Sequence, residues 1–497
     1  MKNFENLIKE KELLVNKKKI FYNNLNRLNL NLDDFNKFHA KKFSAKESIT
    51  FAKISGDHNP IHVDKYYAQD TFFGKPLIHG IHALIYALNI LTKKEIFFEK
   101  IKIIFLKPIF ENKKLFFYFN ESNNLIFIVH NNVICTKIFI ETKYSEFSND
   151  LNIKYIRNKR KKKSKIVNLK KISVNEKYKF NHVCDLKKAK IKYPYIFKFY
   201  GDLIASEIID LSYLIGMECP GYYSMFSEAQ ISIKKNSKDQ RYFVKNIDKR
   251  FNLINLNVLG NSINADLKAF FRPKKVQYPK INKLLRIIKK NEFASIKALI
   301  IGGSKGLGKL TAKIIAAGGG EVIITYNESK NEAKKTYDEI KNFGSKCKII
   351  KFDVKNQINL KNIKTEINQC YYYATPKIFQ KEQKEYDNKM LTKFLQYYVK
   401  NFQNIFKYIN KSYPKCRYFI PSTISINKPI QEILEYTLAK LETEIWVSRL
   451  SEKFKNKILI ERLPRLLTEQ TNTILQNKLT NTNITILNSI RKLTNNE

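Results

Sequence analysis

The sequence predicts two α+β units in succession and then a doubly wound α/β domain. In the first unit an apolar helix at residues 81–91 precedes strands between residues 102 and 142. The second unit repeats that order, with a helix at 203–215 and strands between residues 229 and 271. From Ile296 onward strands and helices alternate, which is typical of a parallel sheet covered on both faces. The length of 497 residues suits about three domains.

The net charge and the composition of the chain bear on which partners it can bind. The formal net charge is +46, from 91 basic and 45 acidic residues. Because Lys, Asn and Ile are all abundant, we attribute most of that charge to a base-composition bias of the gene. The charge can still attract an anionic partner. We expect no nucleic-acid binding, because the sequence has neither a nucleic-acid-binding motif nor one basic domain.

Cysteine usage and hydropathy predict a reducing, cytoplasmic setting. The six cysteines form no C-x-x-C pair, so neither a disulfide framework nor a zinc site is predicted. His79-x-x-His82 has no matching ligand pair elsewhere, so we expect no metal. Residues 1–19 alternate charged and apolar side chains, unlike a secretory signal. No apolar run approaches the ~20 residues of a membrane-spanning helix.

Residues 51–80 carry the clearest chemical signal, FAKISGDHNPIHVDKYYAQDTFFGKPLIHG, with three of the chain's seven histidines, and His82 follows directly. Asp57 and His62 stand five residues apart, and a carboxylate and an imidazole that converge can hold a water and move protons at adjacent carbons. A helix that starts at Gly80 offers backbone N–H groups that can stabilise charge on a carbonyl oxygen. These groups suit hydration or dehydration beside a thioester carbonyl.

This stretch resembles the signature of the MaoC-like, R-specific enoyl-CoA hydratase family of hot-dog folds. The family pattern S-G-D-x-N-P-x-H, followed after a gap by H-G, is matched at every position that it specifies. The resemblance implies that Asp57 and His62 are the catalytic pair and that Gly80 donates a backbone hydrogen bond to the thioester carbonyl. It also implies substrate-positioning roles for Ser55, Asn59 and His79.

The second unit has the rhythm of the first but lacks the S-G-D-x-N-P-x-H string. The segment Phe270–Pro273 at its end resembles Leu106–Pro108 in the first unit. We expect a non-catalytic hot-dog unit that pairs with the first and walls an acyl tunnel. The expected order of parts is a helical extension (1–42), a catalytic hot-dog unit (43–148), a solvated basic linker (149–164), a second hot-dog unit (165–279), a charged connector (280–294) and a Rossmann-type domain (295–497).

The last domain opens with a predicted dinucleotide site. A buried strand at 297–301 leads into a glycine-rich loop, a helix to Ala317 and a second strand at 321–325. Glycines let the backbone approach a pyrophosphate at the helix N-terminus. The spacing G-x-x-x-G-x-G resembles the short-chain dehydrogenase/reductase family. The resemblance implies these cofactor-binding residues: Gly302, Ser304, Lys305, Gly306, Leu307, Gly308, Asp353 and Lys440.

Tyr436-x-x-x-Lys440 resembles the catalytic pair of that family. Residues i and i+4 share a helix face, so Lys440 can lower the tyrosine pKa from about 10 and bind the nicotinamide ribose. Tyr436 would then protonate the substrate carbonyl oxygen as hydride arrives. Thr423 stands at the family's serine spacing and Ser422 is adjacent, so either hydroxyl could serve. Asn401 could match the family's helix asparagine.

Two features separate this domain from the family pattern. The usual Asn-Asn-Ala-Gly segment is replaced by residues 371–376, YYYATP, and the region between strands is short. The second strand ends at Thr325–Asn327 without an acid that would repel a 2′-phosphate, and Lys305 could attract one. We therefore favour NADP over NAD.

Together these patterns predict a bifunctional enzyme of fatty-acid-like or polyketide-like acyl metabolism. It would combine an (R)-3-hydroxyacyl-CoA/ACP dehydratase (enoyl hydratase) with an NADP-dependent 3-oxoacyl reductase. The expected partner is an acyl-CoA or acyl carrier protein thioester, and a homodimer is compatible with both domains. Two alternatives stay open: a hydratase or dehydratase with a degenerate nucleotide-binding domain, and a non-catalytic basic binding protein.

Overall fold

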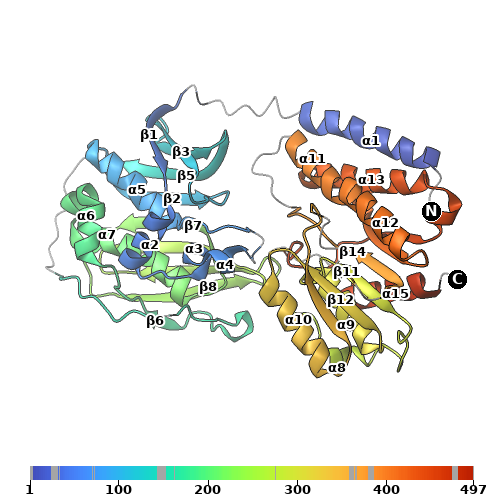
Figure 1. Cartoon of the computed structure of the whole chain (residues 1–497). Helices are drawn as coiled ribbons and strands as arrows, with labels where there is room; N and C mark the ends of the chain where they lie inside the picture. The colour runs from blue at the N-terminus through green and yellow to red at the C-terminus, as the bar shows by residue number, and fades with distance from the viewer. Residues whose placement is uncertain are drawn as a thin grey trace. The chain divides into compact units, whose positions relative to one another are not determined.

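The computed structural model describes residues 4–23, 32, 34–69, 71, 73–142, 153–161, 163–274, 276–356, 363, 366–378, 386–472 and 480–495. These residues form two compact units (Figure 1). The antiparallel unit lies within residues 29–275, and the parallel unit is made by residues 4–23 together with the chain from 276 onward.

The antiparallel unit is built on one ten-stranded sheet of order β1-β3-β4-β5-β2-β7-β10-β9-β8-β6. Its strands are β1 (Asn36–Lys42), β2 (Phe98–Phe105), β3 (Lys114–Asn120), β4 (Leu125–His130), β5 (Val133–Thr142), β6 (Lys177–Lys179), β7 (Ser224–Ile233), β8 (Arg241–Asp248), β9 (Leu253–Leu259) and β10 (Ile263–Phe271). Strands β3, β4 and β5 lie within residues 102–142, where the sequence predicts strands.

The two halves of this sheet follow the same path. The first half runs 1-3-4-5-2, and the second, read from its outer edge, runs 6-8-9-10-7, which is the same order five strands later. The halves join where β2 pairs antiparallel with β7, from Lys100 opposite Ser232 to Ile104 opposite Glu228. Each half therefore covers an edge strand that the other would leave unpaired.

One long helix stands at the same place in each half. Helix α5 (Gly80–Lys93) lies between β1 and β2, and α7 (Pro194–Tyr213) lies between β6 and β7. Most residues of both helices are buried, and the two helices pack against each other. A π-turn, η3 (Leu214–Glu218), continues α7. The shorter helices are α2 (Ala45–Ser55), α3 (Pro60–Val63), α4 (Lys65–Gln69) and α6 (Leu186–Lys192).

One expected boundary of this unit is wrong. Residues 36–42, expected in a helical extension, form β1 and pair with β3. The described part of the basic segment 149–164 has many exposed side chains, as expected of a solvated linker, but it also contacts both halves of the unit. Arg160 donates to the backbone carbonyl oxygens of Ile54 and Val183, each at 2.7 Å, and so joins the two halves. Charge composition alone does not reveal such backbone contacts.

The parallel unit has a six-stranded parallel sheet of order β13-β12-β11-β14-β15-β16. This 3-2-1-4-5-6 order is that of the doubly wound dinucleotide-binding fold. The strands are β11 (Lys297–Ile301), β12 (Glu321–Tyr326), β13 (Cys347–Lys351), β14 (Gln369–Tyr372), β15 (Arg417–Thr423) and β16 (Ile458–Leu463). The helices are α1 (Phe4–Asn23), α8 (Ile281–Leu284), α9 (Gly306–Ala317), α10 (Lys330–Asn342), α11 (Asn388–Leu395), α12 (Asn401–Ser412), α13 (Leu434–Ser448), α14 (Glu452–Lys455) and α15 (Thr482–Asn495).

Alternate residues of strand β11 pack into two apolar cores, one on each face of the sheet. Ile300 points into the core on one face and Leu299 into the core on the other, as the two-residue period of a strand requires. The expected charged connector contributes to the first core, because Ile281 and Leu284 of α8 are buried there. That segment is therefore part of the fold.

Helix α1 belongs to the parallel unit and packs along α13 (Figure 1). Leu7 and Leu14 are buried against Leu441 and its apolar neighbours. Arg462 bridges the two helices, since it donates to Glu10 of α1 and to Glu444 of α13, each at 2.6 Å. None of the helices in the described part of the chain has the length and apolar character needed to cross a membrane.

Replacing Arg160 by Met should lower the free energy of unfolding of the antiparallel unit by about 2 kcal/mol, because charge-assisted hydrogen bonds to buried carbonyls are lost. Lys159→Met, at an exposed neighbour, is the control. Urea unfolding followed by circular dichroism should show the loss. The fluorescence of Trp446, the chain's one tryptophan, reports the parallel unit and should not change. Equal curves for both variants would contradict the role of Arg160.

Candidate active sites

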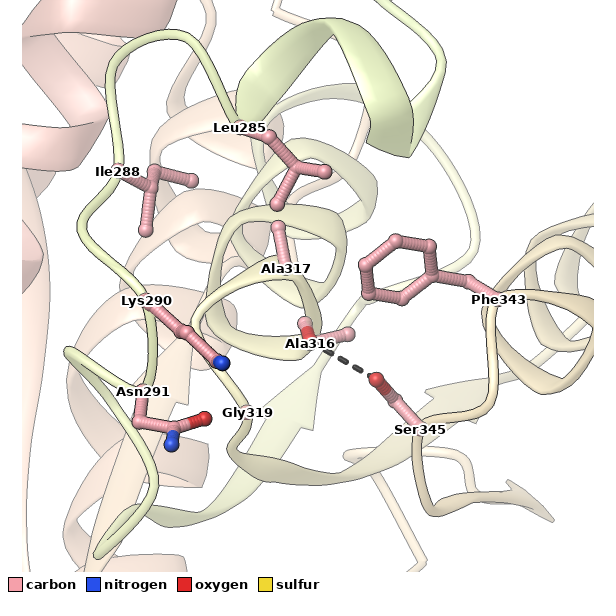
Figure 2. Close-up of a pocket in the computed structure, with 9 residues that line it drawn as sticks. All are labelled: Leu285, Ile288, Lys290, Asn291, Ala316, Ala317, Gly319, Phe343 and Ser345. Carbon is pink, nitrogen blue, oxygen red and sulfur yellow. Dashed lines mark hydrogen bonds between the residues drawn. The ribbon is translucent and has the colours of Figure 1, made fainter.

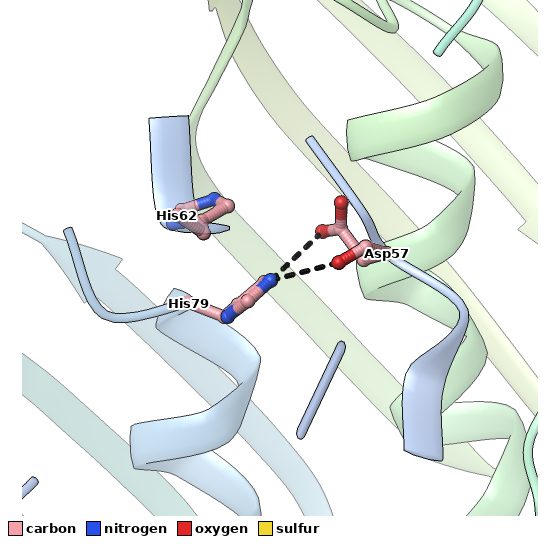
Figure 3. A group of neighbouring side chains, drawn as sticks. All are labelled: Asp57, His62 and His79. Atoms are coloured by element: carbon pink, nitrogen blue, oxygen red, sulfur yellow. Dashed lines mark hydrogen bonds and ion pairs between the residues drawn. The ribbon is translucent and has the colours of Figure 1, made fainter. Parts of the chain in front are cut away.

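The turn between α2 and α3 brings Asp57 and His62 together. Helix α2 ends at Gly56, whose φ of 76° is a left-handed conformation that favours glycine. Asn59 then caps α3, which opens at a proline. Figure 3 shows the carboxylate of Asp57 close to the rings of His62 and His79, and one ligand-type atom of each lies within 4.8 Å of the others.

His62 presents a proton acceptor. Its Nδ1 lies 2.8 Å from the carbonyl oxygen of Leu77, and because a carbonyl only accepts, Nδ1 carries the proton. Burial lowers the pKa of His62 to about 3, helped by the neighbouring His79, so the ring is neutral at pH 7. A neutral imidazole with a lone pair on Nε2 can take a proton from water.

Asp57 is 3% exposed and is held by two hydrogen bonds. The backbone N–H of Asn59 donates to Oδ1 at 3.1 Å, and the hydroxyl of Ser212 donates to Oδ2 at 2.8 Å. Burial raises the pKa of Asp57, while the charge interaction with His62 and these hydrogen bonds oppose the rise. The protein thereby fixes the orientation of the carboxylate.

His79 supports the loop that carries Asp57. Its Nε2 donates to the backbone carbonyl oxygen of Asp57 at 3.0 Å, and its ring stacks on His62 with 3.9 Å between centroids. Burial lowers the pKa of His79 to about 3. The three side chains also have the spacing of metal ligands. However, the His79 nitrogen that faces Asp57 is Nε2. Because it carries a proton, it cannot bind a metal ion in this arrangement.

Ser55 and Asn59, expected to position substrate, bind protein groups instead. The hydroxyl of Ser55 donates to the carbonyl oxygen of Phe51 at 2.9 Å and accepts from the N–H of Asp57 at 3.1 Å. Asn59 is fully buried, and its amide donates to the carbonyl oxygen of Gly216 at 3.1 Å. In this geometry both side chains hold the loop of Asp57 in shape.

Gly80 places a helix N-terminus beside the pair. A Cβ at this position would lie 2.6 Å from the ring of Phe105, so no larger residue fits without a shift. The N–H groups of the first turn of α5 have no partner inside the helix, and this end carries partial positive charge. A carbonyl oxygen that gains negative charge would be stabilised there.

The second half has its own buried acid–histidine cluster, but it serves the backbone. Glu207 accepts from the N–H of Asn261 at 2.6 Å and contacts Nε2 of His182 at 3.0 Å. Asp210 accepts from the N–H of Cys184 at 2.8 Å, and burial raises its pKa to about 7. These carboxylates anchor turns of the chain.

In the parallel unit, residues 302–308 form the loop between β11 and α9. Gly302 and Gly306 have φ of 79° and 61°, a region that favours glycine. A Cβ on Gly308 would lie 2.5 Å from the carbonyl oxygen of Gly302, so the loop and helix need glycine to pack. Because α9 starts at Gly306, its N-terminus, which carries partial positive charge, lies at the end of this loop. The loop also contains Ser304, Lys305 and Leu307.

Tyr436 and Lys440 lie one turn apart on α13. Tyr436 hydrogen-bonds to the side chain of Thr423, yet burial raises the pKa of Tyr436 to about 12. Lys440 donates from Nζ to the carbonyl oxygen of Pro421 at 2.7 Å and lies 4.0 Å from the ring centre of Tyr398. Burial lowers the pKa of Lys440 to about 7. The expectation that Lys440 lowers the tyrosine pKa is therefore wrong for this arrangement, because burial dominates.

The two candidate hydroxyls have different partners. Ser422 donates to Glu444, whose carboxylate also accepts from Arg462, whereas Thr423 is hydrogen-bonded to Tyr436. Of the two hydroxyls, the one of Thr423 therefore lies beside Tyr436.

The other residues that the sequence predicts for this site lie elsewhere in the parallel unit. Asn401 is buried at the start of α12, and its Oδ1 accepts from Gln396 at 2.7 Å. Its Nδ2 has no hydrogen-bond partner among the described residues. Asp353 follows β13 and accepts from the N–H of Lys355 at 3.0 Å. The substituted segment after β14 places Tyr373 against Thr311 of α9, with 2.8 Å between their hydroxyl oxygens.

Figure 2 shows a hollow near the other end of α9, beside Ala316 and Ala317. Its wall includes Leu285 and Phe343, and the hydroxyl of Ser345 donates to the carbonyl oxygen of Ala316 at 2.8 Å. Twelve helical residues span about 18 Å, so this hollow is separate from the glycine loop.

Comparison with protein families assigns both parts of the chain. Residues 33–142 match the MaoC like domain, and residues 297–373 match the short chain dehydrogenase family. The chain joins a MaoC-like domain to a short-chain dehydrogenase domain. The MaoC-like match covers β1 to β5 and the Asp57–His62 pair, and the dehydrogenase match covers β11 to β14 with the glycine loop.

Two curated proteins share a short stretch with this chain. Over 42 residues it is 43% identical to the (R)-specific enoyl-CoA hydratase of Aeromonas caviae, covering 8% of this chain and 31% of that protein. Over 42 residues it is 40% identical to the 3-hydroxybutyryl-CoA dehydratase of Methylorubrum extorquens, covering 8% and 27%. The chain thus spans less than a third of the length of these relatives.

Solved structures of dehydrogenases and reductases are also similar. FolM alternative dihydrofolate reductase 1 from Brucella suis, in complex with NADP, is 19% identical with a TM-score of 0.29, covering 34% of this chain and 71% of that chain. A mutant short-chain dehydrogenase/reductase of Serratia marcescens is 16% identical with a TM-score of 0.35, covering 39% and 89%.

Three residues at the first site come from the second half of the antiparallel unit, and sequence reasoning missed all three. Ser212 binds Asp57, and Gly216 accepts from Asn59. Arg272 is 5% exposed and donates to Asn59 at 3.3 Å. Only Arg272 had a signal, because Phe270–Pro273 resembles Leu106–Pro108 of the first unit.

His82 should make the antiparallel unit less stable in acid. Burial lowers its pKa well below 6.5, and neither ring nitrogen has a partner among the described residues. Below pH 6.5 the unfolded chain binds a proton that the folded chain does not, so stability falls as pH falls. His82→Phe should reduce the slope of unfolding free energy against pH by about 1.4 kcal/mol per pH unit between pH 6 and ~4. Equal slopes in urea titrations of both proteins would contradict a neutral His82.

Proposed function

We propose that the antiparallel unit is a double hot-dog (R)-3-hydroxyacyl-thioester dehydratase, which also runs in reverse as an enoyl hydratase. The observation that carries this proposal is the oriented pair of Asp57 and neutral His62 beside the N-terminus of α5. Support for two hot-dog units comes from the repeated strand order and the matching places of α5 and α7.

The geometry suits addition of water to a 2-enoyl thioester. A water held between Asp57 and Nε2 of His62 gives a proton to the pair, and its oxygen bonds to C3. The C2–C3 π electrons move to C2 and the thioester oxygen, where the first turn of α5 at Gly80 stabilises the charge. A proton returned from the pair to C2 completes the 3-hydroxyacyl product. Dehydration is the same path in reverse.

Asp57→Asn should lower kcat for hydration of crotonyl-CoA by about 10³-fold, because the amide cannot take up a proton. Asp64→Asn is the control, since Asp64 is an exposed carboxylate at the end of α3. Loss of the enoyl-thioester absorbance measures the reaction. Should wild type leave crotonyl-CoA and longer 2-enoyl-CoA or carrier-protein thioesters unchanged, the dehydratase proposal fails.

We propose that the parallel unit reduces a 3-oxoacyl thioester with NADPH. The glycine loop fits a pyrophosphate, because its positive φ angles and close helix contact exclude side chains there. When bound, the nucleotide supplies hydride. Tyr436, with Thr423 beside it, would protonate the ketone oxygen. Lys305 in the loop supports NADP over NAD, since it can attract a 2′-phosphate.

Thr423→Ala should lower kcat for NADPH-dependent reduction of acetoacetyl-CoA by about 10²-fold, because Thr423 hydrogen-bonds to Tyr436. Ser422→Ala should cost much less, since that hydroxyl is directed to Glu444. The absorbance of NADPH follows the reaction. A larger loss in Ser422→Ala than in Thr423→Ala would contradict the assignment.

A second candidate is a dehydratase with a nucleotide-binding domain that does not reduce. Two observations favour it: Lys440 is held by Pro421 and the ring of Tyr398, and the carboxylate of Glu469 would lie 3.7 Å from a Cβ at Gly306. Calorimetric titration with NADPH separates the candidates. Binding without acetoacetyl-CoA reduction favours the second candidate, and reduction that is lost in Tyr436→Phe favours the first.

The acyl carrier is proposed to be CoA or an acyl carrier protein. The names of the curated relatives specify CoA substrates, and the formal net charge of +46 would favour an acidic carrier protein. A non-catalytic basic binding protein is the competing class. It predicts that Asp57→Ala leaves function in the cell intact.

A further inference from the structure

We infer that the second half of the antiparallel unit completes the catalytic site, with Ser212 as the positioning residue of Asp57. This inference rests on the proposed dehydratase function, which it deepens. The second half, which lacks the S-G-D-x-N-P-x-H pattern, would then be an obligatory part of the active site.

The direct contact is a buried hydrogen bond. The hydroxyl of Ser212, near the end of α7, donates to Oδ2 of Asp57 at 2.8 Å, and Ser212 is 4% exposed. Oδ1 accepts from the N–H of Asn59, which belongs to the loop of Asp57 itself. Ser212 is therefore the second-half group that fixes the rotation of the carboxylate, and it leaves the other lone pairs for water.

The chain after Ser212 makes room for the same carboxylate. A Cβ at Gly216 would lie 2.2 Å from Oδ1 of Asp57, closer than any real contact. The backbone there belongs to the π-turn η3, and no left-handed φ demands glycine at this position. The close approach of Asp57 thus explains the glycine.

Further hydrogen bonds of Asn59 and Arg272 hold the second half against the catalytic loop. The amide of Asn59 donates to the carbonyl oxygens of Gly216 and Gly221, each at 3.1 Å. Arg272 donates to Oδ1 of Asn59 at 3.3 Å and to the carbonyl oxygen of Tyr222 at 2.6 Å. The site is consequently built across the join of the two halves.

The electrostatic consequence can be measured. The groups that face Asp57 are His58 on its own loop, His62 on α3, His79 at the start of α5 and Ser212 on α7. Burial raises the pKa of Asp57, and the Ser212 hydrogen bond opposes that rise. Without this hydroxyl the carboxylate protonates at higher pH, so the acidic limb of the activity profile moves up in pH.

The test compares Ser212→Ala with Ser206→Ala, a buried serine on the same helix that donates to the backbone carbonyl of Asp202. With crotonyl-CoA, Ser212→Ala should lower kcat about 10- to 100-fold with KM unchanged, and shift the acidic limb to higher pH. Ser206→Ala should match wild type, and Ser212→Thr should restore activity. Gly216→Ala should also lose activity, because its methyl group displaces Asp57.

A second readout separates this inference from the proposed function. The carboxylic-acid infrared band that is absent in Asp57→Asn identifies Asp57, and in Ser212→Ala that band should appear at higher pH than in wild type. Equal kcat and equal titration in Ser212→Ala and Ser206→Ala would overturn the inference while the dehydratase proposal stands. Absence of hydration by wild type would overturn the dehydratase proposal, and the infrared titration would still decide whether Ser212 controls Asp57.

Discussion

The pairing of β2 with β7 is the constraint on which the antiparallel unit depends. It joins two five-stranded halves of equal topology into one sheet and brings α5 and α7 into contact. The loop of the first half that carries Asp57 then meets the end of α7, where Ser212 and Gly216 lie. A carboxylate as deeply buried as Asp57 needs hydrogen bonds to keep its orientation, and one of them comes across the join.

Burial gives the two members of the pair complementary roles. It lowers the pKa of His62 and raises that of Asp57. Both shifts favour the uncharged form of the side chain. The hydrogen bond from Nδ1 of His62 to Leu77 selects the tautomer in which Nε2 accepts. In the parallel unit burial acts on Tyr436 and Lys440 in the same way, raising one pKa and lowering the other. At both sites desolvation therefore shifts the pKa values more than nearby charges do.

The sequence predicts what depends on local pattern. Strands β3, β4 and β5 lie in the region where strands are expected, and β11 has the expected bounds, because β-branched and aromatic residues are frequent there between turn residues. Asp57 and His62 are found because the residues that shape their loop are consecutive. Strand β1 is missed because its sequence, NKFHAKK, is charged, as suits an edge strand. Arg160 and Ser212 act through contacts with residues more than a hundred positions away, which no local pattern encodes.

The central claim is that one chain carries two consecutive acyl-thioester reactions, and a single incubation tests it most directly. Acetoacetyl-CoA and NADPH are added to wild type, Asp57→Asn and Tyr436→Phe, and the acyl-CoA products are identified by mass spectrometry. The account predicts 3-hydroxybutyryl-CoA and crotonyl-CoA with wild type, 3-hydroxybutyryl-CoA alone with Asp57→Asn, and neither with Tyr436→Phe. Crotonyl-CoA formed by Asp57→Asn, or no product from wild type, would contradict it.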